Sequence, residues 1–195
     1  MAVTTWHWVR HGPTHEKTFV GWRDVPADLS DTAQIARLHA HLPKQALLIS
    51  SDLIRASATA DAIAHPKRQR LPHDPALREL DFGVWDGMHF SDVADRDPEL
   101  SRAYWETPGD ISAPDGESWN QAASRVGDVV DRLNGTHPDI HIIAVAHFGV
   151  ILTQVQRALG VTAYQAMAHK IDNLSVTSLT FASGAWSVAA INHCP

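Results

Sequence analysis

Short apolar runs alternate with stretches of helical periodicity along nearly the whole chain. Residues 45–50 (QALLIS) and 140–146 (IHIIAVA) are almost wholly apolar, as is typical of strands buried on both faces of a sheet. Strands separated by helices favour a three-layer α/β/α fold with a largely parallel central sheet. Ser30 and Asp52 are the expected N-caps of the first two helices. The stretches with apolar residues at helical spacing are 30–42, 52–63, 118–133 and 149–159.

The two ends of the chain also predict strands. Residues 4–10 are rich in β-formers, and residues 174–191 predict a hairpin that turns at Ser183 and Gly184. The stretch from 77 to 117 is rich in Asp, Gly, Pro and Trp, so we expect short helices and irregular structure there.

Composition restricts the class of protein. The chain of 195 residues has no repeat or linker, which predicts a single domain over residues 1–195. It carries 22 acidic against 16 basic residues, a balance that disfavours nucleic-acid binding through a basic face. No apolar run reaches the roughly 20 residues of a membrane helix, and no secretory signal is visible, so a soluble cytoplasmic protein is expected. The lone Cys194 excludes an intramolecular disulfide and a multi-cysteine metal site.

Basic side chains follow three of the predicted parallel strands. Arg10 and His11 come directly after the first strand, Arg55 lies about one helical turn beyond the second, and His147 follows the third. Ligands of open α/β sheets bind at the carboxyl ends of the strands, where these residues should meet. Like charges are costly to gather unless an anion offsets them, and guanidinium forks suit bidentate phosphate binding. The sequence therefore predicts a pocket for a phosphoryl group.

Each of these residues also has a simpler interpretation. His11 beside Arg10 is compatible with a surface pair, Arg55 with a solvent-facing helix residue, and His147 with a hydrogen-bonded core histidine. Their placement at equivalent strand ends is what favours a shared site.

The 13 histidines do not form a metal-binding pattern. His39 and His41 are two residues apart on a predicted helix and point away from each other. His137 and His141 straddle a proline, and no H-E-x-x-H motif occurs. We therefore expect no metal and no cofactor.

Five motifs are spread in order along the chain: VRHGPT (9–14), SDLIRASATA (51–60), LRELDFGVWDG (77–87), PDGES (114–118) and VAHFGV (145–150). Together they resemble the motifs of the histidine phosphatase superfamily, and its phosphoglycerate-mutase-like branch most closely. The Phe-Gly-x-Trp-Asp-Gly stretch after Glu79 is similar to that of the smaller phosphatases, including α-ribazole-phosphate phosphatases. The resemblance covers about residues 5–192.

The resemblance implies a role for each residue of the predicted pocket. His11 would be the nucleophile that forms a phosphohistidine, and this requires a neutral imidazole whose other ring nitrogen gives its proton to a partner such as a backbone carbonyl. Arg10, Arg55 and His147 would surround the nonbridging oxygens and stabilise their charge. Glu79 would protonate the leaving alkoxide and then act as base toward water.

Several positions differ from the commonest family residues. Pro13 replaces the usual acidic residue, Lys17 replaces an Asn that is often present, and Phe148 replaces a small residue after the second histidine. Thr14, Lys17, Gly21 and Phe148 are the predicted substrate contacts. Lys17 is equally compatible with a solvated loop lysine, and the Phe148 ring with packing in the core.

The segments of about 12–28 and 85–117 are predicted to form a small cap over the site. Residues 80–117 carry two arginines against ten carboxylates, which suits a mutase poorly because a mutase must hold an anionic intermediate away from water. A phosphomonoesterase acting on a small phosphorylated metabolite is therefore favoured. A phosphoglycerate-mutase-type phosphoryl transfer and a noncatalytic phosphate-binding protein are the alternatives. The seven tryptophans leave a homodimer open.

Overall fold

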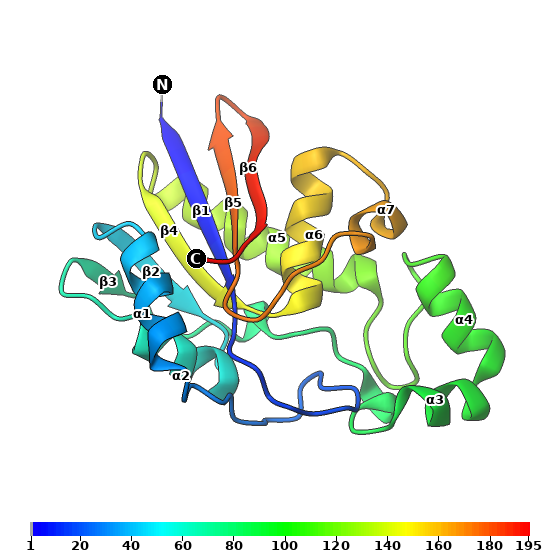
Figure 1. Cartoon of the computed structure of the whole chain (residues 1–195). Helices are drawn as coiled ribbons and strands as arrows, with labels where there is room; N and C mark the ends of the chain where they lie inside the picture. The colour runs from blue at the N-terminus through cyan, green and yellow to red at the C-terminus, as the bar shows by residue number, and fades with distance from the viewer. Residues whose placement is uncertain (1) are drawn as a thin grey trace.

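A six-stranded mixed sheet runs through the computed structural model, which describes residues 2–195 (Figure 1). The strand order is β3-β2-β4-β1-β5-β6. The first four of these strands are parallel, whereas β5 and β6 form an antiparallel hairpin beside β1. The strands are β1 (Val3–Arg10), β2 (Ala46–Ser50), β3 (Arg68–Arg70), β4 (His141–Ala146), β5 (Val176–Ala182) and β6 (Ala185–His193).

Helices cover both faces of this sheet, with α1 and α2 on one side and α5 and α6 on the other (Figure 1). This arrangement confirms the predicted α/β class with its largely parallel sheet. The helices are α1 (Thr32–His41), α2 (Ile54–Ala62), α3 (Phe90–Arg96), α4 (Pro98–Glu106), α5 (Trp119–Thr136), α6 (Phe148–Leu159) and α7 (Ala163–Met167). Two short 3₁₀ helices, Pro75–Leu77 and Gly83–Trp85, precede α3.

The apolar run of β4 is explained by the two cores on either side of the sheet. Ile142 and Ala144 pack into the core beneath α5 and α6, whereas Ile143 and Val145 pack into the core beneath α1 and α2. Successive side chains of a strand point to opposite faces, so a strand buried on both faces must be apolar at every position.

The two predicted N-caps are wrong. Helix α1 begins after Asp31, whose carboxylate accepts a hydrogen bond from the Gln34 amide, so Ser30 lies one residue too early. Helix α2 begins after Leu53. Asp52 instead accepts hydrogen bonds of 2.8 and 2.5 Å from the Arg78 guanidinium. Because such a bidentate, charged pair is stronger than a hydrogen bond from a backbone amide, the Asp52 carboxylate binds Arg78 and does not cap α2.

Strand β3 and helix α7 were not predicted. β3 has only three residues, Arg-Gln-Arg, at the edge of the sheet, so it lacks an apolar period. Helix α7 has five residues and depends on a capping box between Thr162 and Gln165.

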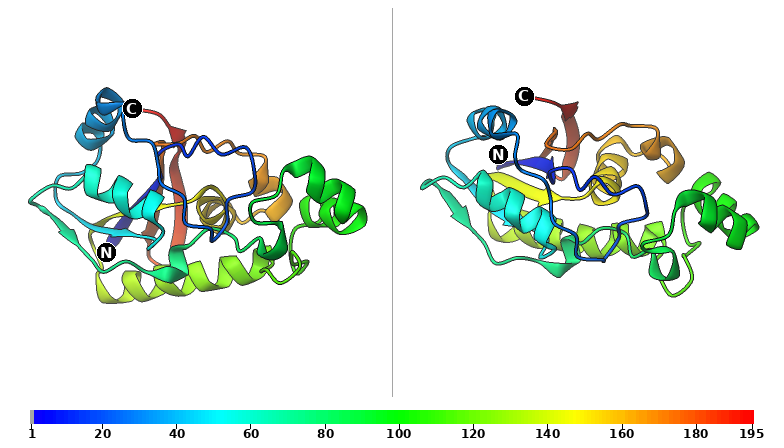
Figure 2. Two further views of the ribbon diagram at one scale, coloured as in Figure 1. Left: turned by 90° about the horizontal axis from the view of Figure 1, so that it is seen from below. Right: turned by 60° about the horizontal axis from the view of Figure 1, so that its bottom comes forward.

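The strand order β2-β4-β1 places the carboxyl ends of three parallel strands side by side. Arg10 is opposite Ala146, and Ser50 is opposite Val145. The loop after β1 runs along this edge toward α3 and α4, which project from one side of the molecule (Figure 2). The Phe19 and Met88 backbones join the loop to the segment before α3 by a 3.0 Å hydrogen bond. No helix among residues 2–195 has the length and apolar character needed to cross a bilayer.

Candidate active site

The sheet edge brings five predicted residues together. His11 and His147 lie with their ring centroids 5.1 Å apart. Arg10, His11, Arg55 and Glu79 line one cavity of about 300 Å³. Side chains from the end of β1, from α2, from the loop before α3 and from the start of α6 therefore meet at one place, although these segments are far apart in the sequence.

The neutral state of His11 is set by its surroundings. Its Nδ1 lies 2.7 Å from the carbonyl oxygen of Gly12, and a carbonyl can only accept, so Nδ1 carries the proton. Burial, reinforced by the nearby Arg55 charge, lowers the pKa of His11 to about 3. The Nε2 lone pair is therefore available at neutral pH.

Two side chains that the sequence did not indicate hold this strand end in place. The Gly12 amide donates to the Thr59 hydroxyl at 3.0 Å, and the Asn173 amide donates to the His11 carbonyl at 2.8 Å. A Cβ at Gly12 would lie 2.6 Å from the end of the Leu29 side chain and 3.1 Å from the Asp28 carbonyl oxygen, so a larger residue here would displace its neighbours in the loop after β1. Asn173 lies in the stretch IDNLSVTSL, where only its proximity in the fold reveals its contact with His11.

Arg55 is a buried cation that only backbone carbonyls hold. Its side chain donates to the Gly21 and Arg23 carbonyls at 2.6 and 3.0 Å and is 1% exposed. Arg10 donates to the Ile171 carbonyl at 2.7 Å. Burial lowers the pKa of both guanidinium groups. Neither forms an ion pair with a carboxylate within residues 2–195, so the pair is suited to an anion from outside the chain.

His147 is fully buried, and neither of its ring nitrogens has a hydrogen-bond partner within the part of the chain that the structure describes. Burial and the Arg55 charge lower its pKa well below the usual range. A neutral imidazole has one N–H to donate. Because buried polar groups are normally hydrogen-bonded, this donor favours a ligand oxygen as its partner.

Glu79 reaches the site from the loop that precedes α3, and its carboxylate is held by two backbone amides. Oε1 accepts from the Leu80 amide at 3.0 Å and from the Gly149 amide at 3.1 Å. Gly149 is the second residue of α6, where backbone N–H groups have no partner within the helix. A Cβ at this glycine would lie 2.7 Å from Glu79 Oε1, so only glycine leaves room for the carboxylate.

The backbone of Glu79 is fixed as well. Its carbonyl accepts hydrogen bonds of 2.8 Å from both Arg125 and Trp22. Arg125 is in turn paired with Glu117, and the Glu117 carboxylate accepts from the Asp81 amide. These contacts join α5 to the loop that carries Glu79. None of them has a signal in the local sequence.

The four residues predicted to contact the substrate differ in their position relative to the cavity that contains His11. Thr14 and Phe148 line the cavity, and the Phe148 ring centroid is 5.4 Å from the Arg10 guanidinium carbon. Gly21 acts on the site through its carbonyl, which accepts from Arg55. Lys17 is exposed and is not among the residues that line the cavity.

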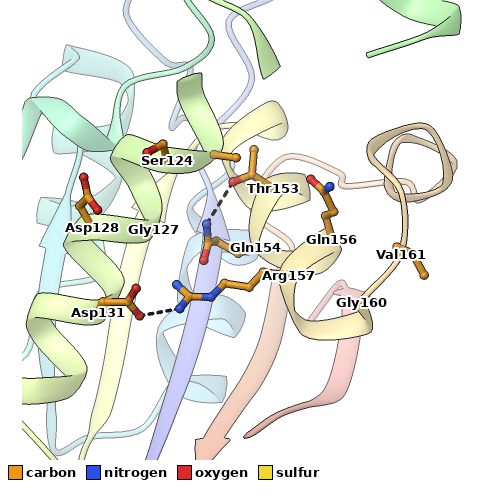
Figure 3. A pocket seen from close by; sticks show the side chains of 11 residues that line it. Ser124, Gly127, Asp128, Asp131, Thr153, Gln154, Gln156, Arg157, Gly160 and Val161 are labelled. Carbon is orange, nitrogen blue, oxygen red and sulfur yellow. Dashed lines mark hydrogen bonds and ion pairs between the residues drawn. The ribbon is translucent and has the colours of Figure 1, made fainter. Parts of the chain in front are cut away.

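A larger hollow of about 480 Å³ lies between α5 and α6 (Figure 3). Arg157 and Asp131 form a 2.6 Å ion pair across it, so its arginine is already neutralised. It contains none of the predicted site residues. The unpaired cations Arg10 and Arg55 are in the smaller cavity, which we therefore assign as the candidate active site.

The fold and this cavity define the class: an α/β protein whose sheet edge carries a neutral imidazole beside the guanidinium groups of Arg10 and Arg55. The chain belongs to the histidine phosphatase superfamily (branch 1), because the model of that family matches residues 7–193. Proteins named as phosphatases and as probable mutases are among those that resemble this chain. The resemblance inferred from the motifs is thereby confirmed.

Relatives of several kinds match this chain. The bifunctional protein Rv2228c of Mycobacterium tuberculosis is 32% identical over 175 residues, which cover 89% of this chain and 46% of the relative, so the chain spans about half its length. The adenosylcobalamin/alpha-ribazole phosphatase of Escherichia coli K12 is 27% identical, covering 95% of this chain and 89% of the relative. A probable phosphoglycerate mutase GpmB of Enterobacter is 28% identical, covering 91% and 85%. The solved structure of Bacillus stearothermophilus YhfR superposes with a TM-score of 0.89 at 23% identity, covering 98% of both chains, and shows the shared fold.

Proposed function

We propose that the protein is a phosphomonoesterase that hydrolyses a small phosphorylated metabolite through a phosphohistidine on His11, without a metal ion. The observation that carries this proposal is the pair of guanidinium groups of Arg10, which is half-buried, and Arg55, which is buried. Both line the same cavity as the neutral His11, and neither forms an ion pair with a carboxylate in residues 2–195. Such a set of fixed charges stabilises a transferring phosphoryl group.

The first step forms a P–N bond and breaks the ester P–O bond. His11 Nε2 attacks phosphorus in line, while Arg10, Arg55 and the His147 N–H contact the nonbridging oxygens. Glu79 transfers its proton to the departing oxygen, because an alkoxide is too basic to leave unprotonated. In the second step Glu79 takes a proton from water, the water oxygen attacks phosphorus, and the P–N bond breaks to release inorganic phosphate and free His11.

Phosphatase is favoured over mutase by the charges that line the cavity. The arginines that line it are Arg10 and Arg55, and one phosphate group needs both of them. A mutase would need further cations to retain a phosphorylated acid. We also propose that segments 12–28 and 85–117 act as the cap, because both contribute side chains to the cavity.

The experiment that tests the proposal is a rapid acid-free quench during turnover of a radiolabelled phosphate monoester in the presence of EDTA. We expect label on the protein that is stable in alkali, labile in acid and located on His11. Loss of turnover with the chelator, or the absence of protein-bound label before the steady state, would contradict the mechanism.

Adding a methyl group at Gly149 is expected to lower kcat/KM by about 10- to 100-fold, since small displacements of a catalytic group have effects of this size. The new Cβ in Gly149→Ala would lie 2.7 Å from Glu79 Oε1 and 2.6 Å from Leu80 Cδ1, so it would displace the carboxylate together with the Leu80 side chain. Gly135→Ala is the matched control, because a Cβ there meets nothing within 4 Å on helix α5. Steady-state kinetics and thermal unfolding of both variants check the result, and an unchanged kcat/KM in Gly149→Ala would show that this contact does not position Glu79.

A further inference from the structure

Five aromatic side chains line the candidate active site. We call Phe19, Phe82, Phe90, Trp105 and Phe148 the aromatic wall, since all five line the cavity that contains His11. Phe19 is at its centre, with ring centroids 4.9 Å from Phe82, 4.4 Å from Phe90 and 5.9 Å from Trp105. The wall draws on the loop after β1, on the segment just before the 3₁₀ helix Gly83–Trp85, on α3, on α4 and on the start of α6.

Burial in the core does not account for the whole wall. Phe90 is 55% exposed although it contacts Phe19, and Trp105 is only half-buried on α4. Exposed aromatic surface at the rim of a polar cavity is typical of a binding surface. The rings are therefore available to cover the part of a substrate that projects from the phosphate.

The cavity lining has no arginine or lysine among the described residues besides Arg10 and Arg55. Glu16 lines the cavity, and its Oε2 accepts hydrogen bonds from Arg23 at 2.9 Å and from the Thr18 hydroxyl at 3.3 Å. Arg23 and Glu16 form an ion pair, so their charges offset each other. A carboxylate or a second phosphate on the leaving group would therefore find no free cation in the cavity lining beyond the two arginines that hold the phosphate.

We infer that, for the hydrolysis proposed above, the preferred substrates carry a planar, uncharged aromatic leaving group. Phe90 and Trp105 cover this group, and the lining has no third arginine or lysine to bind a further anion. This assigns the specificity of the site to two aromatic residues outside the phosphoryl-transfer machinery. It excludes sugar acids and bisphosphates as preferred substrates.

The test compares three esters that all release an alkoxide: benzyl phosphate, glycerol 3-phosphate and 3-phosphoglycerate. We expect kcat/KM for benzyl phosphate to exceed that for glycerol 3-phosphate by about tenfold or more, and 3-phosphoglycerate to be the poorest. Phe90→Ala and Trp105→Ala should each reduce the benzyl-to-glycerol ratio. Glu16→Gln frees the Arg23 guanidinium from its ion pair and should therefore raise kcat/KM for 3-phosphoglycerate relative to glycerol 3-phosphate. Tyr164→Ala is the control, because it removes an aromatic ring that is 61% exposed and lies outside the cavity.

Equal kcat/KM values for benzyl phosphate and glycerol 3-phosphate, or a ratio unchanged in both wall variants, would overturn the inference. If none of the esters is hydrolysed, the proposed function fails. The inference is then decided by calorimetric binding of benzylphosphonate against 3-hydroxypropylphosphonate, which needs no turnover. Tighter binding of benzylphosphonate that is lost in Phe90→Ala would support it, and equal binding would contradict it.

Discussion

Replacing His11 with Asn is expected to lower kcat by about 10⁴-fold or more, because the variant has no nucleophile to form the covalent intermediate. Asn is the informative substitution, since its side-chain amide can still donate to the Gly12 carbonyl that now holds His11 Nδ1. The cavity and its two guanidinium groups should therefore remain. Steady-state hydrolysis of benzyl phosphate measures the loss.

Binding of inorganic phosphate separates a lost nucleophile from a lost pocket. We expect His11→Asn to keep its affinity for phosphate within about tenfold, since Arg10 and Arg55 provide the main charge interactions. His141→Asn is the control, because His141 is exposed at the start of β4, at the end of the strand opposite the site. Activity of His11→Asn within about tenfold of the unmodified protein would contradict the nucleophile assignment.

Replacing Glu79 with Gln is expected to slow the first turnover of benzyl phosphate by about 10²- to 10⁴-fold, the usual contribution of a general acid. A Gln side-chain oxygen can still accept from the Leu80 and Gly149 amides, so the geometry is kept while the proton is lost. The leaving alkoxide then departs unprotonated.

The dependence of the Glu79→Gln effect on the leaving group distinguishes a general acid from a residue that only supports the structure of the site. 4-Nitrophenolate is a weak base that leaves without a proton, so Glu79→Gln should slow its release in the first turnover by less than about tenfold. Rapid mixing measures the release of 4-nitrophenolate in the first turnover, before hydrolysis of the phosphohistidine limits the rate. Glu99→Gln, an exposed carboxylate on α4, should leave both esters unaffected. Equal losses for the two esters would show that Glu79 is not the acid.

The order of strands and helices could be predicted because each element carries its own period of apolar residues. The run at 140–146 predicted β4 without knowledge of its neighbours, and the helical spacing at 118–133 predicted α5. Helix starts were less predictable. Asp31 and Ser30 both have side chains that can cap α1, and Arg78, which is distant in sequence, draws Asp52 away from α2.

The site residues at the ends of the parallel strands could also be predicted from the sequence. A polar residue that directly follows a buried parallel strand must lie at the carboxyl edge of the sheet, and this reasoning located Arg10, His11 and His147. The resemblance to the family motifs added Glu79. The neutral tautomer that the chemistry requires also has the backbone carbonyl partner that we expected for it.

The sequence by itself thus determined which side chains stand at the ends of the strands, because a strand's period and its end are local properties of the chain. Only the tertiary structure decided that the Gly149 amide holds the Glu79 carboxylate, that Arg125 fixes its backbone, and that Phe19 and Trp105 form part of one wall. These contacts join segments that are far apart in the chain, and no local pattern encodes them, since each depends on how the loops pack against α5 and α6.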